Sequence, residues 1–127
     1  MMTNNSEWNQ IVFRDAIELP ITRQNLFFMQ RQFSVANNIK FFPYDAIGAM
    51  NPADNYMLSY RVKTLMIETD LGFTIETDIV DKRYVFRNRS HSKGTARYMN
   101  EKNIQPGDVI VIEKIDAYNY KMYTKRG

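Results

Sequence analysis

Alternating apolar and polar residues predict a chain built mainly from short strands. The strongest signal lies in residues 56–68 and 73–80, which are rich in Val, Ile, Thr and Tyr. An Asp-Leu-Gly sequence at residues 70–72 has the composition of a hairpin turn, so we expect these two segments to pair. An earlier extended segment is predicted over residues 11–22, where apolar side chains recur and Pro20 opposes a helix.

The C-terminal half continues the strand pattern and adds one helix. A reversal is expected at residues 80–82, followed by alternation over residues 83–89. Residues 94–103 predict a helix of one or two turns. After a Pro-Gly-Asp turn, an apolar strand over residues 109–115 is expected to pair with residues 118–124.

Two segments of the first half give weaker signals. Residues 41–47 predict a short helix that begins at Pro43 and ends at Gly48, with its neighbouring Phe side chains in the core. Residues 25–35 mix aromatic, Met and polar side chains without a clear period. Repeated strands, few helices and no βαβ rhythm together predict a mainly β fold, either a barrel or a sandwich with one or two short helices.

Size and composition limit the possibilities further. A chain of 127 residues suits one domain, which we expect over residues 11–127 after a frayed lead-in over residues 1–10. The absence of cysteine excludes disulfides, thiolate zinc sites and iron–sulfur clusters, and His91 is the one histidine, so no cofactor or metal is expected. No apolar run approaches the roughly 18 residues of a membrane helix. We therefore expect no membrane partner, a cytoplasmic location and, since no amphipathic seam is visible, a monomer.

The net charge of +3 conceals a strong asymmetry. Up to Asp81 the chain holds six Lys or Arg against ten Asp or Glu, whereas from Lys82 onward it holds eleven against four. Residues 82–97 contain six basic side chains and no acidic one. Such segregation favours a polyanionic partner, and a solvated surface strand is the alternative explanation.

Catalytic patterns are missing from the sequence. Metal-dependent nucleases commonly need an Asp/Glu-x-Lys triplet to hold Mg²⁺ and place the attacking water, and none exists here. His91-Ser92-Lys93 approaches the His-x-Lys core of phospholipase D-type hydrolases, but the second histidine of that mechanism is absent. Gly-x-Ser-x-Gly and phosphate-binding glycine loops are absent too. The domain itself is therefore expected to be non-catalytic.

Three stretches occur in an order and spacing that suggest one family: KFFPYDAIG at residues 40–48, TIETDIVDKRYVFRNR at residues 74–89 and NIQPGDVIVIEKIDAYNY at residues 103–120. Across about residues 17–123, the chain resembles the bacterial DNA-binding pseudobarrel domains related to the plant B-three domain. These are recognition or effector domains of Type II restriction endonucleases such as EcoRII and BfiI. The resemblance implies a seven-stranded open pseudobarrel with double-stranded DNA as partner, and it leaves open whether a nuclease domain belongs to the same chain.

The resemblance further implies two arms that grip the major groove of DNA. We call residues 22–31 the N-arm and residues 76–89 the C-arm. Arg side chains pair bidentately with guanine, Asn and Gln pair with adenine, and a carboxylate accepts from cytosine. The expected contacts on the N-arm are Arg23, Gln24, Asn25, Gln30 and Arg31. Those on or beside the C-arm are Asp78, Asp81, Lys82, Arg83, Arg87, Asn88, Arg89 and Lys93.

Two other functions stay open at this point. One is a phosphodiester hydrolase that uses His91 and Lys93. The other is a binding module for RNA or single strands, a common role of small barrels.

Overall fold

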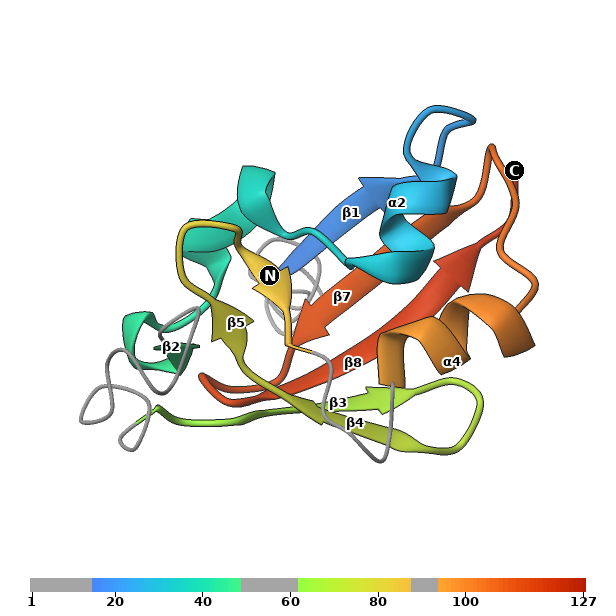
Figure 1. The fold of residues 1–127 in the computed structure, drawn as a ribbon. Helices are drawn as coiled ribbons and strands as arrows, with labels where there is room; N and C mark the ends of the chain where they lie inside the picture. Colours follow the sequence, from blue (N-terminus) through green and yellow to red (C-terminus); the bar gives the residue numbers. More distant parts are fainter. Residues whose placement is uncertain (1–14, 49–61, 88–93) are drawn as a thin grey trace, which may run out of the picture.

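Two mixed sheets make up most of the fold (Figure 1). The structure is a computed structural model, and it describes residues 15–48, 62–87 and 94–127. In these residues one sheet has five strands in the order β1-β7-β8-β3-β4, and the other has three in the order β2-β5-β6. The strands of the larger sheet are β1 (Ala16–Pro20), β3 (Leu65–Thr69), β4 (Thr74–Thr77), β7 (Val109–Lys114) and β8 (Asn119–Lys125). Those of the smaller sheet are β2 (Ile47–Gly48), β5 (Ile79–Val80) and β6 (Val85–Phe86).

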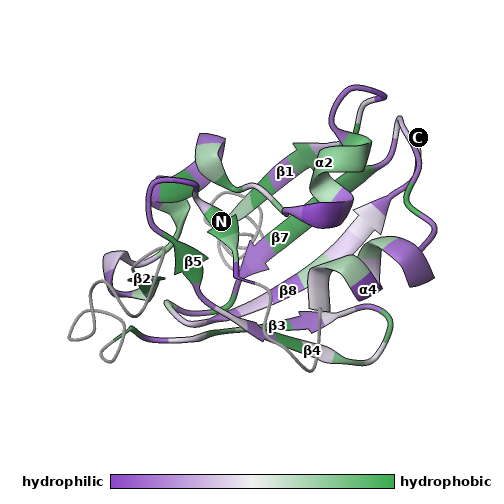
Figure 2. Ribbon diagram, viewed as in Figure 1, coloured by the Kyte–Doolittle hydropathy of each residue, from purple (hydrophilic) through white to green (hydrophobic). Residues whose placement is uncertain are grey.

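The larger sheet carries a large share of the core. Strands β7 and β8 pair antiparallel with Ile112 opposite Met122, and β8 runs parallel to β3 with Tyr120 opposite Ile67. All four side chains are buried. Along β3 and β8 the adjacent Glu68 and Lys121 are exposed, as strand alternation requires, whereas β7 also buries Val111 next to Ile112. Figure 2 shows the resulting alternation of hydrophobic and hydrophilic colours along β1. The predicted pairing of the last two strands is confirmed.

The predicted hairpin at residues 70–72 is also confirmed. Strands β3 and β4 are antiparallel on either side of it, and Gly72 has a φ of 91°. This left-handed backbone suits glycine, which has no Cβ to clash. The first predicted strand, residues 56–68, corresponds to β3, which begins only at Leu65. Residues 62–64 belong to no strand, and residues 56–61 lie outside the described residues.

The prediction for residues 41–47 is partly wrong. Instead of one α-helix, two 3₁₀ segments occur, η1 (Ala36–Phe41) and η2 (Tyr44–Ala46), and Pro43 does precede the second. Gly48 does not end a helix but belongs to β2, which runs parallel to β5. The reason is a partner distant in sequence: the Asp81 N–H donates to the Gly48 carbonyl at 2.8 Å and draws this segment into the smaller sheet.

Two α-helices complete the described part of the chain: α2 (Leu26–Arg31) and α4 (Gly94–Glu101). Only Met29 of α2 is buried, so the sequence shows no helical period there. The predicted helix at residues 94–103 is confirmed as α4, which buries Tyr98 and Met99. Gly94 lets α4 approach β4 closely, since a Cβ there would lie 2.7 Å from Cγ2 of Ile75.

The mainly β class, the open arrangement and the few short helices agree with the sequence prediction. The described residues form eight strands rather than the seven expected. In the described part of the chain, no helix is both long and apolar enough to span a bilayer.

Candidate nucleic-acid interface

The N-arm and the C-arm are joined by backbone pairing. After α2 the chain runs antiparallel to β6, with Ser34 opposite Val85. The Phe86 N–H donates to the Phe33 carbonyl at 3.0 Å, and the Val35 N–H donates to the Tyr84 carbonyl at 2.8 Å. The rings of Phe33 and Phe86 are stacked with centroids 5.4 Å apart. These contacts fix the segment that directly follows the N-arm against β6 of the C-arm. In Figure 1 the N-arm turn lies at the upper right and the C-arm turn at the left, beside η1.

The N-arm begins with a turn that uses the side chain of Asn25. Its Oδ1 accepts the Thr22 N–H at 2.8 Å, its Nδ2 donates to the Pro20 carbonyl at 2.9 Å, and its own N–H donates to Thr22 Oγ1 at 3.1 Å. Asn25 therefore holds the turn together, and its amide already has two partners. Arg23 and Gln24, at the tip of the same turn, are exposed.

Helix α2 presents both polar and aromatic side chains to solvent. Gln30 and Arg31 are exposed, and the Arg31 guanidinium lies 4.7 Å from the ring centroid of Phe27. Phe27 and Phe28 are 64% and 48% exposed. Residues 25–35 show no clear period in the sequence, so the exposure of these two rings was not predicted. The adjacency of Phe27 and Phe28 was no signal either, because α4 buries its adjacent residues Tyr98 and Met99.

The C-arm ends in a turn over residues 81–84 with an unusual backbone. Lys82 and Tyr84 have φ values of 71° and 54°, a region that side-chain-bearing residues seldom adopt. Lys82 and Arg83 are exposed and make no ion pair with any described residue. Asp81 is half-buried beside them. The tip of the C-arm therefore carries two exposed cations that have no ion-pair partner among the described residues, next to the carboxylate of Asp81.

At the base of the C-arm, Asp78 is occupied by Arg87. The Nε of Arg87 lies 2.9 Å from Oδ2 and 3.2 Å from Oδ1 of Asp78. The Asp78 side chain is 1% exposed and that of Arg87 is 21% exposed. A carboxylate this deeply buried is not on the surface to meet a cytosine amine, so the expected role of Asp78 as a base contact does not fit this geometry. Asp78 positions Arg87 instead.

The remaining basic residues divide into two groups. Arg97 turns toward its own helix, where it pairs with Glu101 at 2.7 Å and lies 3.9 Å from the ring centroid of Phe73. Asn88, Arg89 and Lys93 lie outside the described residues, as does His91, so their expected roles stay predictions. Within residues 15–48, 62–87 and 94–127, no three acidic or histidine side chains gather as they would around a metal ion.

No protein-family model matches the sequence, and no curated protein matches it.

Proposed function

We propose that this domain recognises double-stranded DNA sequence-specifically through the major groove, using the N-arm and the C-arm. The observation that carries the proposal is the backbone pairing of residues 33–35 with residues 84–86. This pairing holds two polar turns, distant in sequence, in a fixed relation. A rigid relation between two reading elements is what simultaneous contact with one groove requires.

The charges of the two arms suggest that they contact different parts of the DNA. Lys82 and Arg83 are exposed and unpaired with described residues, so they are suited to phosphate contacts. Arg23, Gln24 and Gln30 sit where few other cations surround them, and their side chains suit base edges. Arg87 is held by Asp78 and would meet the DNA in one orientation. In this proposal the domain is a pseudobarrel recognition or effector domain of a restriction endonuclease, and cleavage belongs to a separate nuclease domain.

A second candidate is binding of single-stranded nucleic acid. The exposed rings of Phe27 and Phe28, with Arg31 beside them, are the observation that favours it. Aromatic side chains next to cations stack unpaired bases with little regard to sequence. The third candidate, a hydrolase that uses His91 and Lys93, has no support from the described residues.

Selection from a randomised duplex library tests the proposal. An enriched motif supports it, and failure to enrich any motif would overturn it. Competition of the enriched duplex with its two separated strands distinguishes duplex from single-strand binding: preference for the strands favours the second candidate. Plasmid incubated with the domain in Mg²⁺ and then in EDTA should stay intact. Metal-independent cleavage that is lost in His91→Ala would favour the hydrolase.

A further inference from the structure

Strand β1 is an edge strand of the larger sheet, so one side of its backbone has no neighbouring strand among the described residues (Figure 1). Asp15 and Ile21 form backbone hydrogen bonds of 2.8 Å on the other side, toward β7 and the residue before it. Ala16 and Glu18 occupy the alternate positions, so their N–H and C=O groups point to the free edge. These groups have no hydrogen-bond partner in the described part of the chain.

The free edge is short because Pro20 ends it. Proline has no N–H, and the Pro20 carbonyl already accepts a hydrogen bond from Asn25 Nδ2 at 2.9 Å. Ala16 and Glu18 together therefore offer two donors and two acceptors, spaced as in an antiparallel β-ladder. The backbone of an extended segment is the group that complements this spacing.

A groove of about 540 Å³ lies beside this part of β1. Its walls are β1 itself, helix α2 and the beginning of η1. Phe28 and Met29 line it from α2, and the Phe28 ring is 48% exposed. Asn37 and Asn38 line it from η1, and their side-chain amides have no partner among the described residues. An unpaired strand edge beside a groove with an apolar wall suits an added strand, whose backbone pairs with the edge and whose side chains fill the groove.

The charges beside the free edge are acidic. Of the described residues that line the groove, Glu18 alone is charged. Asp15 is exposed at the start of β1, and Glu113 lies opposite that end of the strand on β7. Lys121 and Lys125 offset part of this charge, but they belong to β8, two strands away from the free edge. Basic side chains are therefore favoured at this edge, and DNA phosphates are disfavoured.

We propose that the free edge of β1 binds an extended segment of a partner protein in which basic and apolar residues alternate. The two segment residues opposite Ala16 and Glu18 exchange backbone hydrogen bonds with them. Since paired strand residues share a face, the basic side chains of these two residues lie on the acidic outer face of the sheet. The apolar residues between and beside them project to the other face, against Phe28. The site does not use the side chains proposed to contact DNA.

Titration of the full chain against a fluorescently labelled peptide of sequence Val-Lys-Val-Lys-Val tests the site through fluorescence anisotropy. Saturable binding is expected. N-methylation of both Lys residues removes the N–H groups that pair with the β1 edge, so it should weaken binding by about tenfold or more. N-methylation of the central and last Val residues changes N–H groups that point away from β1, and it should leave the affinity unchanged.

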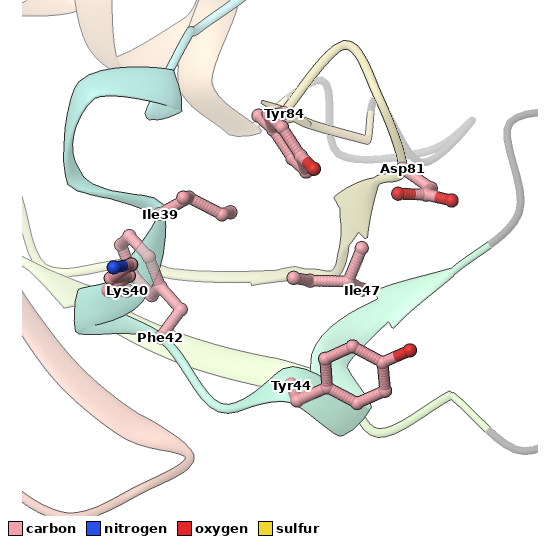
Figure 3. Close-up of a pocket in the computed structure, with 7 residues that line it drawn as sticks. All are labelled: Ile39, Lys40, Phe42, Tyr44, Ile47, Asp81 and Tyr84. Carbon is pink, nitrogen blue, oxygen red and sulfur yellow. The ribbon is translucent and has the colours of Figure 1, made fainter.

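Variants of the protein locate the peptide. Phe28→Ala should weaken binding about tenfold, because it removes the apolar wall that the Val side chains contact. Phe27→Ala is the matched control: Phe27 is an exposed ring of the same helix but is not among the described residues that line the groove, so this variant should bind like the wild type. Tyr44→Ala is a second control, since Tyr44 lines a different hollow beside the C-arm turn (Figure 3). Glu18→Gln should weaken binding at low salt and have less effect at high salt.

Absence of saturable binding, or equal affinity for the two methylated peptides, would overturn the inference. Wild-type affinity in a folded Phe28→Ala variant would overturn it as well, and so would a loss of affinity in Tyr44→Ala. Unchanged affinity in Glu18→Gln would overturn the basic character of the partner. If thermal unfolding shows that Phe28→Ala does not fold, the two methylated peptides decide the question with the wild-type chain. These titrations contain no DNA, so this inference and the proposed function fail separately.

Discussion

Arg87 and Asp78 are joined twice across the base of the C-arm. The Arg87 side chain pairs with the Asp78 carboxylate at 2.9 Å, and the Arg87 backbone N–H donates to the Asp78 carbonyl at 2.8 Å. Gly48 lies directly beside this pair, because a Cβ there would come within 3.2 Å of Asp78 Oδ2 and 3.4 Å of Arg87 Nη2. The pair therefore ties β6 to the end of β4 where the chain passes from one sheet to the other.

Breaking this pair should cost stability. Arg87→Ala leaves the Asp78 carboxylate buried without its guanidinium partner, which we expect to lower the free energy of unfolding by about 3 kcal/mol. Lys82→Ala, at the exposed tip of the same arm, should change it by less than about 0.5 kcal/mol. Urea unfolding of both variants measures the difference. If Arg87→Ala lowers the free energy of unfolding as little as Lys82→Ala does, the Asp78–Arg87 ion pair does not stabilise the fold.

The two N-arm residues Asn25 and Arg23 should respond differently to truncation. Asn25→Ala removes the acceptor for Thr22 and the donor to Pro20, so it should lower the free energy of unfolding by about 1 kcal/mol. Arg23→Ala should leave stability unchanged and, at the selected DNA site, relax discrimination at one base pair by about 1–3 kcal/mol. Thermal unfolding and titration against single-base variants of the site separate the two effects. Full discrimination by Arg23→Ala would remove that residue from the proposed readout.

Duplex affinity should fall steeply with salt. Each phosphate neutralised contributes a log–log slope of about −0.9, so Lys82→Ala and Arg83→Ala should each reduce the slope by about one. The measurement is the dissociation constant across a salt series, for the selected site and for a random duplex. Arg97→Ala serves as the control, since Arg97 is paired with Glu101 on another face, and it should keep the wild-type slope. A wild-type slope near zero would contradict DNA binding.

Stability should decline in acid partly through Asp108. Burial tends to raise the pKa of this carboxyl, but backbone N–H groups of Gln105 and Gly127 and the Arg126 guanidinium at 2.7 Å outweigh it and hold the pKa below its usual value. A lowered pKa stabilises the fold above the unfolded-state value near 4, and that contribution is lost as pH falls through the folded-state pKa. The stability gap between wild type and Asp108→Asn should therefore be largest near neutral pH and close in acid. A gap that is constant with pH would contradict this linkage.

Local sequence determined the elements whose partners are near in the chain. The hairpin at residues 70–72, the pairing of β7 with β8 and helix α4 followed from apolar periodicity and turn composition, because each element buries one regular face against a neighbour. Helix α2 was not predictable in this way, since it buries Met29 alone and so leaves no period in the sequence. Strand β2, which contains Gly48, was not predicted because its partner β5 lies about 30 residues further along the chain.

The same distinction applies to the candidate interface. By itself, the sequence determined which residues carry charge and that the excess of basic residues begins at Lys82, because composition needs no partner. Only the tertiary structure decided which of these side chains are exposed and able to contact a ligand. It buried Asp78 against Arg87, turned Arg97 to Glu101, engaged the Asn25 amide in its own turn and left Phe27 exposed. The physical reason is that exposure and pairing depend on which distant segments meet, and a polar side chain loses its freedom to bind a ligand once burial forces it to take a partner inside the protein.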